Sequence, residues 1–101
     1  MTACLIVRAI VDSKRKDDFD IWYQKEHLPD AMNALGPTSA KRGWSIEDPN
    51  THVAIYEFAS ITEATKATNS QEIIDLIIEF DKHWDGFVTR TREVINLTHS
   101  M

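Results

Sequence analysis

The residues best suited to chemistry gather between positions 21 and 30, where two large aromatic side chains, a carboxylate and an imidazole lie within two helical turns, next to a proline. They are Trp22, Tyr23, Glu26, His27 and Pro29. An imidazole titrates near neutral pH and transfers a proton in either direction, so His27 is our first candidate catalytic residue. The alternative is a structural histidine whose ring packs beside Pro29 and hydrogen-bonds to a loop.

Glu26 is the second candidate catalytic residue. It lies on the same helical stripe as Trp22, and a carboxylate among aromatic side chains can serve as a general acid or base. Structural ion pairs explain such placements more often. We therefore favour a pairing of this carboxylate with Arg8, Arg42 or Arg90 at the edge of the core.

Aromatic residues are the candidate substrate-binding positions, because flat apolar side chains line pockets for flat apolar ligands. They are Trp22, Tyr23, Trp44, Phe58 and Trp84. The hydroxyl of Tyr23 can also bond to a ligand oxygen. The alternative for the group is core packing, which is the commoner role of aromatic residues at helical spacing. A pocket filled by Trp22, Trp44 and Phe58 would be purely structural.

The sequence offers no recognisable metal or cofactor motif. The four histidines lack metal-ligand spacing, and the single cysteine provides no thiolate pair. With only three glycines, a phosphate-cradling loop is excluded. His52 and Tyr56 share one face of a predicted strand, but His52 follows a turn, so we expect it near solvent. We predict no metal and no cofactor.

Length and charge exclude several classes of function. The 101 residues fit a single domain spanning positions 1–101. The net charge of −5 argues against binding to nucleic acids or to anionic membranes. The apolar stretch 3–11 is too short to cross a bilayer and lacks the features of a signal peptide, so we expect a cytoplasmic protein.

Four stretches rich in β-branched and aromatic residues predict strands at positions 3–11, 38–46, 51–59 and 87–97. A helix is expected after Asp12 or Ser13, and Pro29 is expected to end or kink it. A helical turn from 29 to 35, closed by Gly36, follows it. Ser60 and Ser70 are expected to cap the two later helical segments.

The order strand, helix, strand, strand, helix, strand predicts an α+β, ferredoxin-like βαββαβ fold, with a four-stranded antiparallel sheet and two helices on one face. The first strand is apolar on both faces, so a second copy of the chain is the expected cover for the other face. Arg8 lies on that strand, and Glu57 and Glu93 are its plausible partners.

Several short motifs resemble the dimeric α+β barrel superfamily, in particular its EthD-like and antibiotic-biosynthesis-monooxygenase-like members. The motifs are Trp22 followed by Glu26-His27-Leu28-Pro29, Gly36 before a strand, Phe58-Ala59-Ser60 leading into Glu63-Ala64, and Phe80-Asp81 with Trp84. The resemblance covers nearly the whole chain. It implies a homodimer whose two sheets face each other, with a pocket between sheet and helices in each subunit.

The resemblance also frames the functional hypotheses. The first is binding of a small hydrophobic or aromatic molecule, with a cofactor-independent monooxygenation or isomerisation in which His27 transfers a proton. The second is a non-catalytic dimeric ligand-binding or regulatory module. The third is haem binding through His83, because haem-degrading members of the superfamily carry an iron-ligating histidine on the second helix. Sequence alone does not separate the first two.

Overall fold

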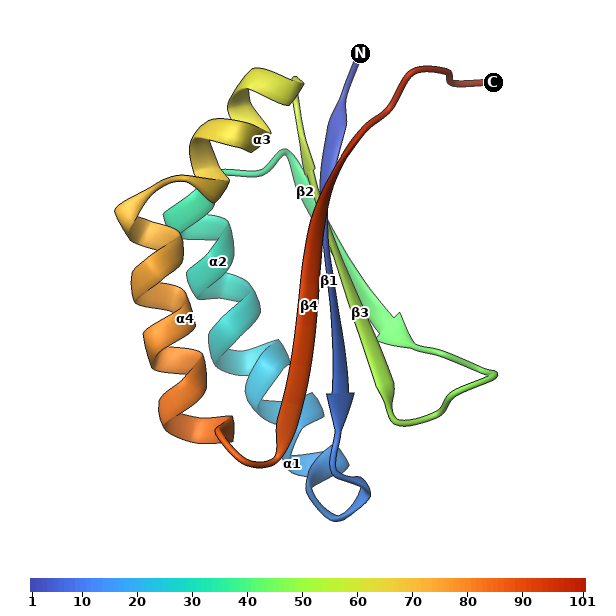
Figure 1. Ribbon diagram of the computed structural model, residues 1–101, viewed down its shortest axis with the longest axis vertical. Helices are drawn as coiled ribbons and strands as arrows, with labels where there is room; N and C mark the ends of the chain where they lie inside the picture. The colour runs from blue at the N-terminus through green and yellow to red at the C-terminus, as the bar shows by residue number, and fades with distance from the viewer.

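A four-stranded antiparallel sheet with helices on one face makes up the chain (Figure 1). The computed structural model describes residues 1–101. In chain order the elements are β1 (Ala3–Val11), a 3₁₀ turn (Ser13–Arg15), α1 (Lys16–Trp22), a π-helical segment (Tyr23–His27), α2 (Leu28–Leu35), β2 (Ser39–Trp44), β3 (Thr51–Phe58), α3 (Ile61–Thr68), α4 (Gln71–Trp84) and β4 (Val88–Asn96).

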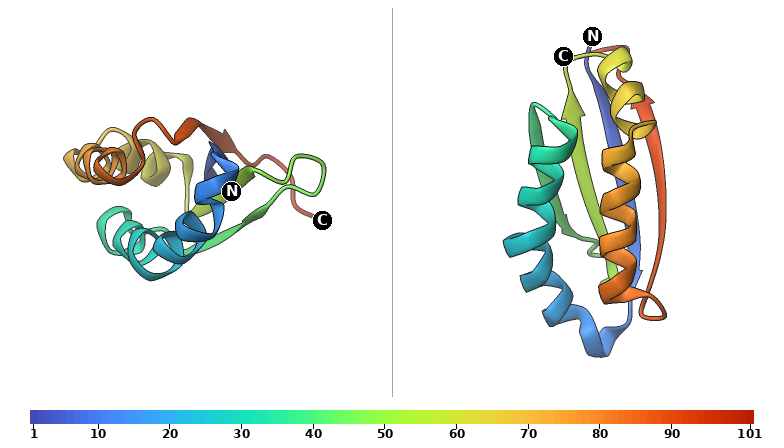
Figure 2. Two further views of the ribbon diagram at one scale, coloured as in Figure 1. Left: turned by 90° about the horizontal axis from the view of Figure 1, so that it is seen from below. Right: turned by 90° about the vertical axis from the view of Figure 1, so that its left-hand side faces the viewer.

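The strands lie in the order β2-β3-β1-β4, and every neighbouring pair is antiparallel. Because β1 and β3 lie in the centre, each crossover helix passes over the sheet to an edge strand, and all helices lie on the same face (Figure 2). This confirms the predicted ferredoxin-like fold. The strands begin and end within two residues of their predicted limits.

The side chains of β1 alternate between a covered and an uncovered face. Leu5, Ala9 and Val11 are buried under the helices, whereas Ile10 on the opposite face is 59% exposed. Arg8 is on this uncovered face too, where its Nη1 lies 2.7 Å from Oε1 of Glu93 on β4. Glu93 is therefore the partner of Arg8, and no helix of the chain covers this face of the sheet (Figure 2).

The first helical arm runs from the 3₁₀ turn to Gly36 without the predicted break at Pro29. Leu28 keeps helical angles although it precedes proline, and its backbone N–H bonds to the carbonyl of Tyr23 in the π-helical segment. Pro29 stands at the start of α2, where a missing amide hydrogen costs little. Gly36 closes α2 in the left-handed conformation with φ of 65°, as predicted.

The second helical arm begins at two serine caps, as predicted. Ser60 Oγ accepts a hydrogen bond from the amide of Glu63, and Ser70 Oγ accepts one from the amide of Ile73. The core lies between these helices and the sheet and is rich in aromatic side chains. None of the helices has the length and apolar character needed to cross a membrane.

Candidate functional site

A cavity of about 270 Å³ lies between the sheet and the two helical arms. Its walls are mainly apolar, with side chains from β1, α2 and α4. The polar residues that line it are Tyr23, His27, His52, Tyr56, Arg90, Thr91 and Arg92, with Thr91 contributing backbone because it pairs with Arg8 on the uncovered face. An apolar pocket with a few polar groups is the usual form of a small-molecule site, and this one is slightly smaller than the usual range for such pockets, roughly 300–1,000 Å³.

His27, at the end of the π-helical segment, lines this cavity as part of an aromatic cluster. Its ring stacks on Trp22 with centroids 5.0 Å apart and an interplanar angle of 23°, and it meets the Phe80 ring edge to face with centroids 5.5 Å apart. Burial lowers the pKa of His27 to about 4, and the nearby Arg90 guanidinium adds to the effect. The imidazole is therefore neutral at neutral pH and keeps one nitrogen free to accept a proton.

His52 is a functional candidate that the sequence interpretation placed wrongly. It was expected near solvent, but the residue is only 1% exposed and lines the cavity. The strand β3 begins at Thr51, directly after the turn, so alternation points His52, Ala54 and Tyr56 towards the helices. The signal was present: a histidine and a tyrosine on the same strand face as buried Ala54.

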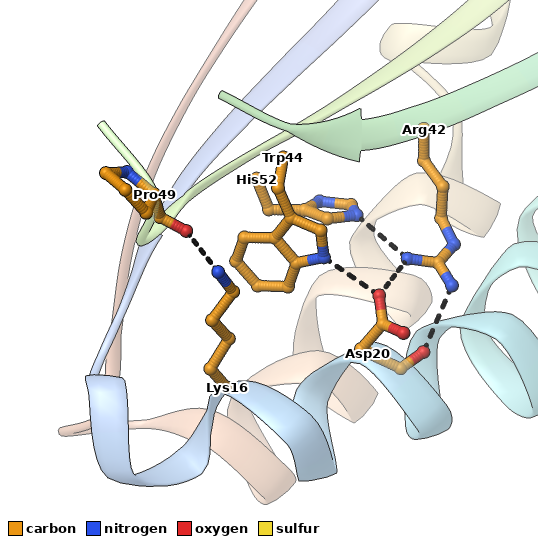
Figure 3. Close-up of polar contacts among 6 residues, drawn as sticks. All are labelled: Lys16, Asp20, Arg42, Trp44, Pro49 and His52. Carbon is orange, nitrogen blue, oxygen red and sulfur yellow. Dashed lines mark hydrogen bonds and ion pairs between the residues drawn. The ribbon is translucent and has the colours of Figure 1, made fainter. Parts of the chain in front are cut away.

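A polar network on one side of the cavity holds His52 (Figure 3). Arg42 Nη1 lies 2.7 Å from Oδ1 of Asp20, and Trp44 donates its indole N–H to the same oxygen at 2.9 Å. The same Nη1 atom lies 3.4 Å from Nε2 of His52. The hydrogen bonds from Arg42 and Trp44 lower the pKa of Asp20, so this carboxylate is ionised. Burial, then the charge of Arg42, lowers the pKa of His52 to about 4.

The hydroxyl groups of Tyr23 and Tyr56 are hydrogen-bonded to each other, with their oxygens 2.5 Å apart, and both residues line the cavity. Burial raises the pKa of Tyr23 well above its usual range and raises the pKa of Tyr56 to about 12. Both hydroxyls are therefore neutral at neutral pH. One donates to the other, so the accepting hydroxyl keeps a proton that it can donate to a ligand.

Arginine side chains complete the polar lining. Arg90 on β4 pairs with Asp81 at 3.1 Å, and its guanidinium lies 4.1 Å from the centre of the Phe80 ring. Arg92 lies two residues further along the same strand. No carboxylate is among the residues that line the cavity. The site is thus rich in hydrogen-bond donors and suits a ligand with acceptor oxygens.

The structure brings His27 and Tyr23 of the predicted site to the cavity, but not the other aromatic residues. Trp22 lies behind His27 and supports its ring. Phe58 and Trp84 are each 2% exposed and belong to the core. Trp44 does not line the cavity and donates a hydrogen bond to Asp20.

Glu26 is exposed and does not line the cavity. It also makes none of the ion pairs that the sequence suggested, because Arg8, Arg42 and Arg90 pair with other carboxylates. Those partners are Glu93, Asp20 and Asp81. Helical spacing alone did not show which side of this helix faces the core and which faces solvent. The π-helical turn also rotates the residues after Trp22, Glu26 included, about the helix axis relative to a regular α-helix.

His83 lies on α4 outside the cavity. Its Nε2 is 3.1 Å from Oε1 of Glu79, one helical turn earlier, and its ring packs against Trp22 with centroids 5.2 Å apart. The side chain is 41% exposed. This arrangement is that of a surface histidine hydrogen-bonded along its own helix, and the haem hypothesis gains no pocket from it.

No protein-family model and no curated protein matches the sequence. Solved structures do match over nearly the whole chain. SnoaB, a cofactor-independent oxygenase from Streptomyces nogalater, aligns with a TM-score of 0.72 at 10% identity, over 99% of this chain and 96% of that chain. An EthD family protein from Bacillus halodurans aligns with a TM-score of 0.68 at 16% identity, over 92% and 97%. The chain therefore shares the ferredoxin-like α+β fold of these proteins.

Another solved structure with this fold carries a different family name. A NIPSNAP family protein of unknown function from Agrobacterium tumefaciens aligns with a TM-score of 0.74 at 12% identity, over 96% of this chain and 88% of that chain. At such identities the comparisons support a common fold and leave the activity to be argued from the site. The cavity lies between the sheet and the helices, where the resemblance implied a pocket.

Proposed function

We propose that this α+β barrel protein binds a small, mainly apolar molecule with an acceptor oxygen in its cavity, and that His27 takes a proton from that molecule. The observation that carries the proposal is a neutral histidine in an apolar cavity whose other polar groups are donors. Such donors stabilise the negative charge on a ligand oxygen. That charge forms when the carbon beside a carbonyl group loses a proton, or when a phenol loses its hydroxyl proton. The ligand class is therefore an enolisable carbonyl compound or a phenol.

Proton removal is the first step of both reactions that the resemblance implies. In an isomerisation of an unsaturated carbonyl compound, His27 returns the proton to the far carbon of the conjugated dienolate, so the double bond moves and no other reactant is needed. In a monooxygenation, molecular oxygen takes up the electrons of the enolate, and a CH₂ group becomes a carbonyl with release of water. SnoaB, which shares the fold, is a cofactor-independent oxygenase, and this makes the second outcome worth testing here.

We also propose that the working form is a homodimer. The helices cover one face of the sheet only (Figure 2), and the other face carries the exposed isoleucines Ile10 and Ile55 near the Arg8–Glu93 ion pair. A second copy of the same sheet would cover these side chains by two-fold symmetry. The two cavities lie on the opposite faces of their sheets, so each subunit would keep its own site.

A non-catalytic ligand-binding module is the second candidate function. One observation favours it: a histidine whose pKa is about 4 is a weak base, and no carboxylate in the cavity strengthens it. A pocket of this kind holds a ligand without reacting with it. The two candidates differ in whether a bound carbonyl compound exchanges its acidic hydrogens.

Hydrogen exchange of a bound ketone separates these candidates. 1-Indanone, a compact aromatic ketone, is incubated with the protein in D₂O, and loss of the proton signal beside the carbonyl is followed by NMR, with binding measured by calorimetry. We expect the wild type to accelerate exchange and His27→Gln to bring it back to the rate in buffer, while His83→Gln, outside the cavity, stays at the wild-type rate. Binding without accelerated exchange would assign the non-catalytic function.

A further inference from the structure

The hydrogen-bond network around His52 was not predicted from the sequence, and it fixes the orientation of one ring. Asp20 on α1 receives hydrogen bonds from Arg42 and Trp44, which both come from β2 (Figure 3). The Asp20 backbone carbonyl accepts a further bond from Nη2 of Arg42 at 3.2 Å. The guanidinium is therefore held at several points, and its Nη1 is directed at Nε2 of His52.

The identity of Arg42 decides which nitrogen of His52 carries the proton. A guanidinium only donates hydrogen bonds, so Nε2 of His52 must be the acceptor. A protonated Nε2 would place two donors face to face beside a permanent positive charge. The neutral ring of His52 therefore carries its hydrogen on Nδ1.

The Nδ1–H group of His52 is the part of the ring that remains for a ligand. It makes no hydrogen bond within the chain. The only fully buried polar side-chain atoms without a partner are the indole nitrogens of Trp22 and Trp84, so Nδ1 of His52 is not fully buried. Because His52 is shielded from bulk solvent and lines the cavity, the access that Nδ1 retains is access to the cavity.

We propose that His52 is a ligand-binding residue that donates a hydrogen bond from Nδ1 to the carbonyl or enolate oxygen of the bound molecule, with Arg42 and Asp20 as positioning residues. This inference rests on the proposed function, since it needs a ligand in the cavity. A neutral imidazole N–H is a suitable electrophile for such an oxygen because it stabilises the enolate without giving up its proton. His27 and His52 then have opposite roles, one accepting a proton and the other donating a hydrogen bond.

The tautomer of His52 can be read in the wild-type protein without any ligand. Long-range proton–nitrogen correlation NMR assigns the protonated nitrogen of each histidine ring. We expect His52 to show a protonated Nδ1 and an unprotonated Nε2, and Arg42→Met, which removes the donor, to yield a mixture of the two tautomers. A protonated Nε2 in the wild type would overturn the proposal, whatever the variants do.

Binding of 1-indanone against indane, which has the same shape without the oxygen, tests the donated hydrogen bond. We expect the wild type to prefer the ketone by roughly fivefold, as one hydrogen bond gives, with the carbonyl stretch shifted to lower frequency and the Nδ1 signal of His52 moved. His52→Leu should lose the preference and the shift. His52→Asn should keep both, because its amide nitrogen lies the same number of bonds from Cβ as Nδ1.

The possible failures are distinguishable. If the wild type binds both compounds equally, or if His52→Leu keeps the preference and the infrared shift, the role of His52 is refuted while the cavity remains a ligand site. If the wild type binds neither compound, the ligand-binding function and the role of His52 both fail. The folded state of each variant is checked by the dispersion of its amide NMR spectrum.

Discussion

His27 and His52 are two buried histidines in one cavity, and both are disfavoured as cations. Burial is the main cause for each, and the charges that face them add to it: Arg90 for His27, and Arg42 for His52, partly offset by Asp20. Each imidazolium would also repel the other. A site with these two rings works in the neutral form, which fits one proton acceptor and one hydrogen-bond donor.

The stability of the protein should therefore depend on pH between 6.5 and about 4, the range between the ordinary histidine pKa and the values in the fold. In this range the unfolded chain binds protons that folded His27 and His52 do not, so the free energy of unfolding falls as the pH falls. Each histidine contributes a slope approaching about 1.4 kcal/mol per pH unit. Urea unfolding at a series of pH values measures the slope.

Single replacements supply the control for this pH dependence. His27→Gln or His52→Asn should each remove about half of the extra slope, whereas replacement of the exposed His99 should leave it unchanged. The slope is the quantity to compare, because the replacements also change stability at neutral pH. A slope that survives removal of both buried histidines would show that carboxylates, and not these rings, cause it.

At the scale of elements, the end of α2 depends on one glycine. Gly36 has φ of 65°, a conformation that side chains with a Cβ atom disfavour by about 1 kcal/mol. Gly43 on β2 has no positive φ and open space beside it. We expect Gly36→Ala to lower the free energy of unfolding by about 1 kcal/mol and Gly43→Ala to change it little. Equal effects in urea unfolding would contradict this account of the cap.

Local patterns were enough to predict the elements. Alternation in residues 3–11, the serines at 60 and 70, and Gly36 each act through neighbouring residues, and each was found where expected. The continuous helix through Pro29 was missed because the π-helical turn that precedes it has no sequence signal of its own. The backbone hydrogen bonds of the π-helical turn show how the helix continues although Pro29 has no amide hydrogen to donate.

The candidate site was predictable only in part, because it depends on long-range contacts. His27 and Tyr23 were found from composition and spacing within one helix. The bond between Tyr23 and Tyr56 spans 33 positions, and no local pattern reports it. The face of a strand that a residue such as His52 occupies follows from alternation, but its role follows from the guanidinium of Arg42 across the hairpin.

At the scale of the whole molecule, one face of the sheet is left uncovered by helices. The helices cover the inner face of the sheet, and on the outer face Ile55 pairs across the strands with Ile6 on β1 and Lys41 on β2. Ile10 lies further along β1 on the same face. Apolar side chains that are gathered in this way on a small domain mark an interface. The proposed homodimer would bury them together with the Arg8–Glu93 ion pair.

A charge placed on this outer face should separate the two subunits. Ile55→Lys puts an ammonium group in the middle of the proposed interface, where two-fold symmetry would set two copies close together, so we expect at least a tenfold rise in the dimer dissociation constant, equivalent to about 1.4 kcal/mol. Ile61→Lys is the matched control, since Ile61 on α3 is 38% exposed against 37% for Ile55 but lies in the helical layer. Sedimentation velocity over a concentration series should show the wild type and Ile61→Lys at twice the chain mass of 11.6 kDa. A wild type that sediments as a stable monomer at micromolar concentration would refute the dimer and leave the outer face without an explanation.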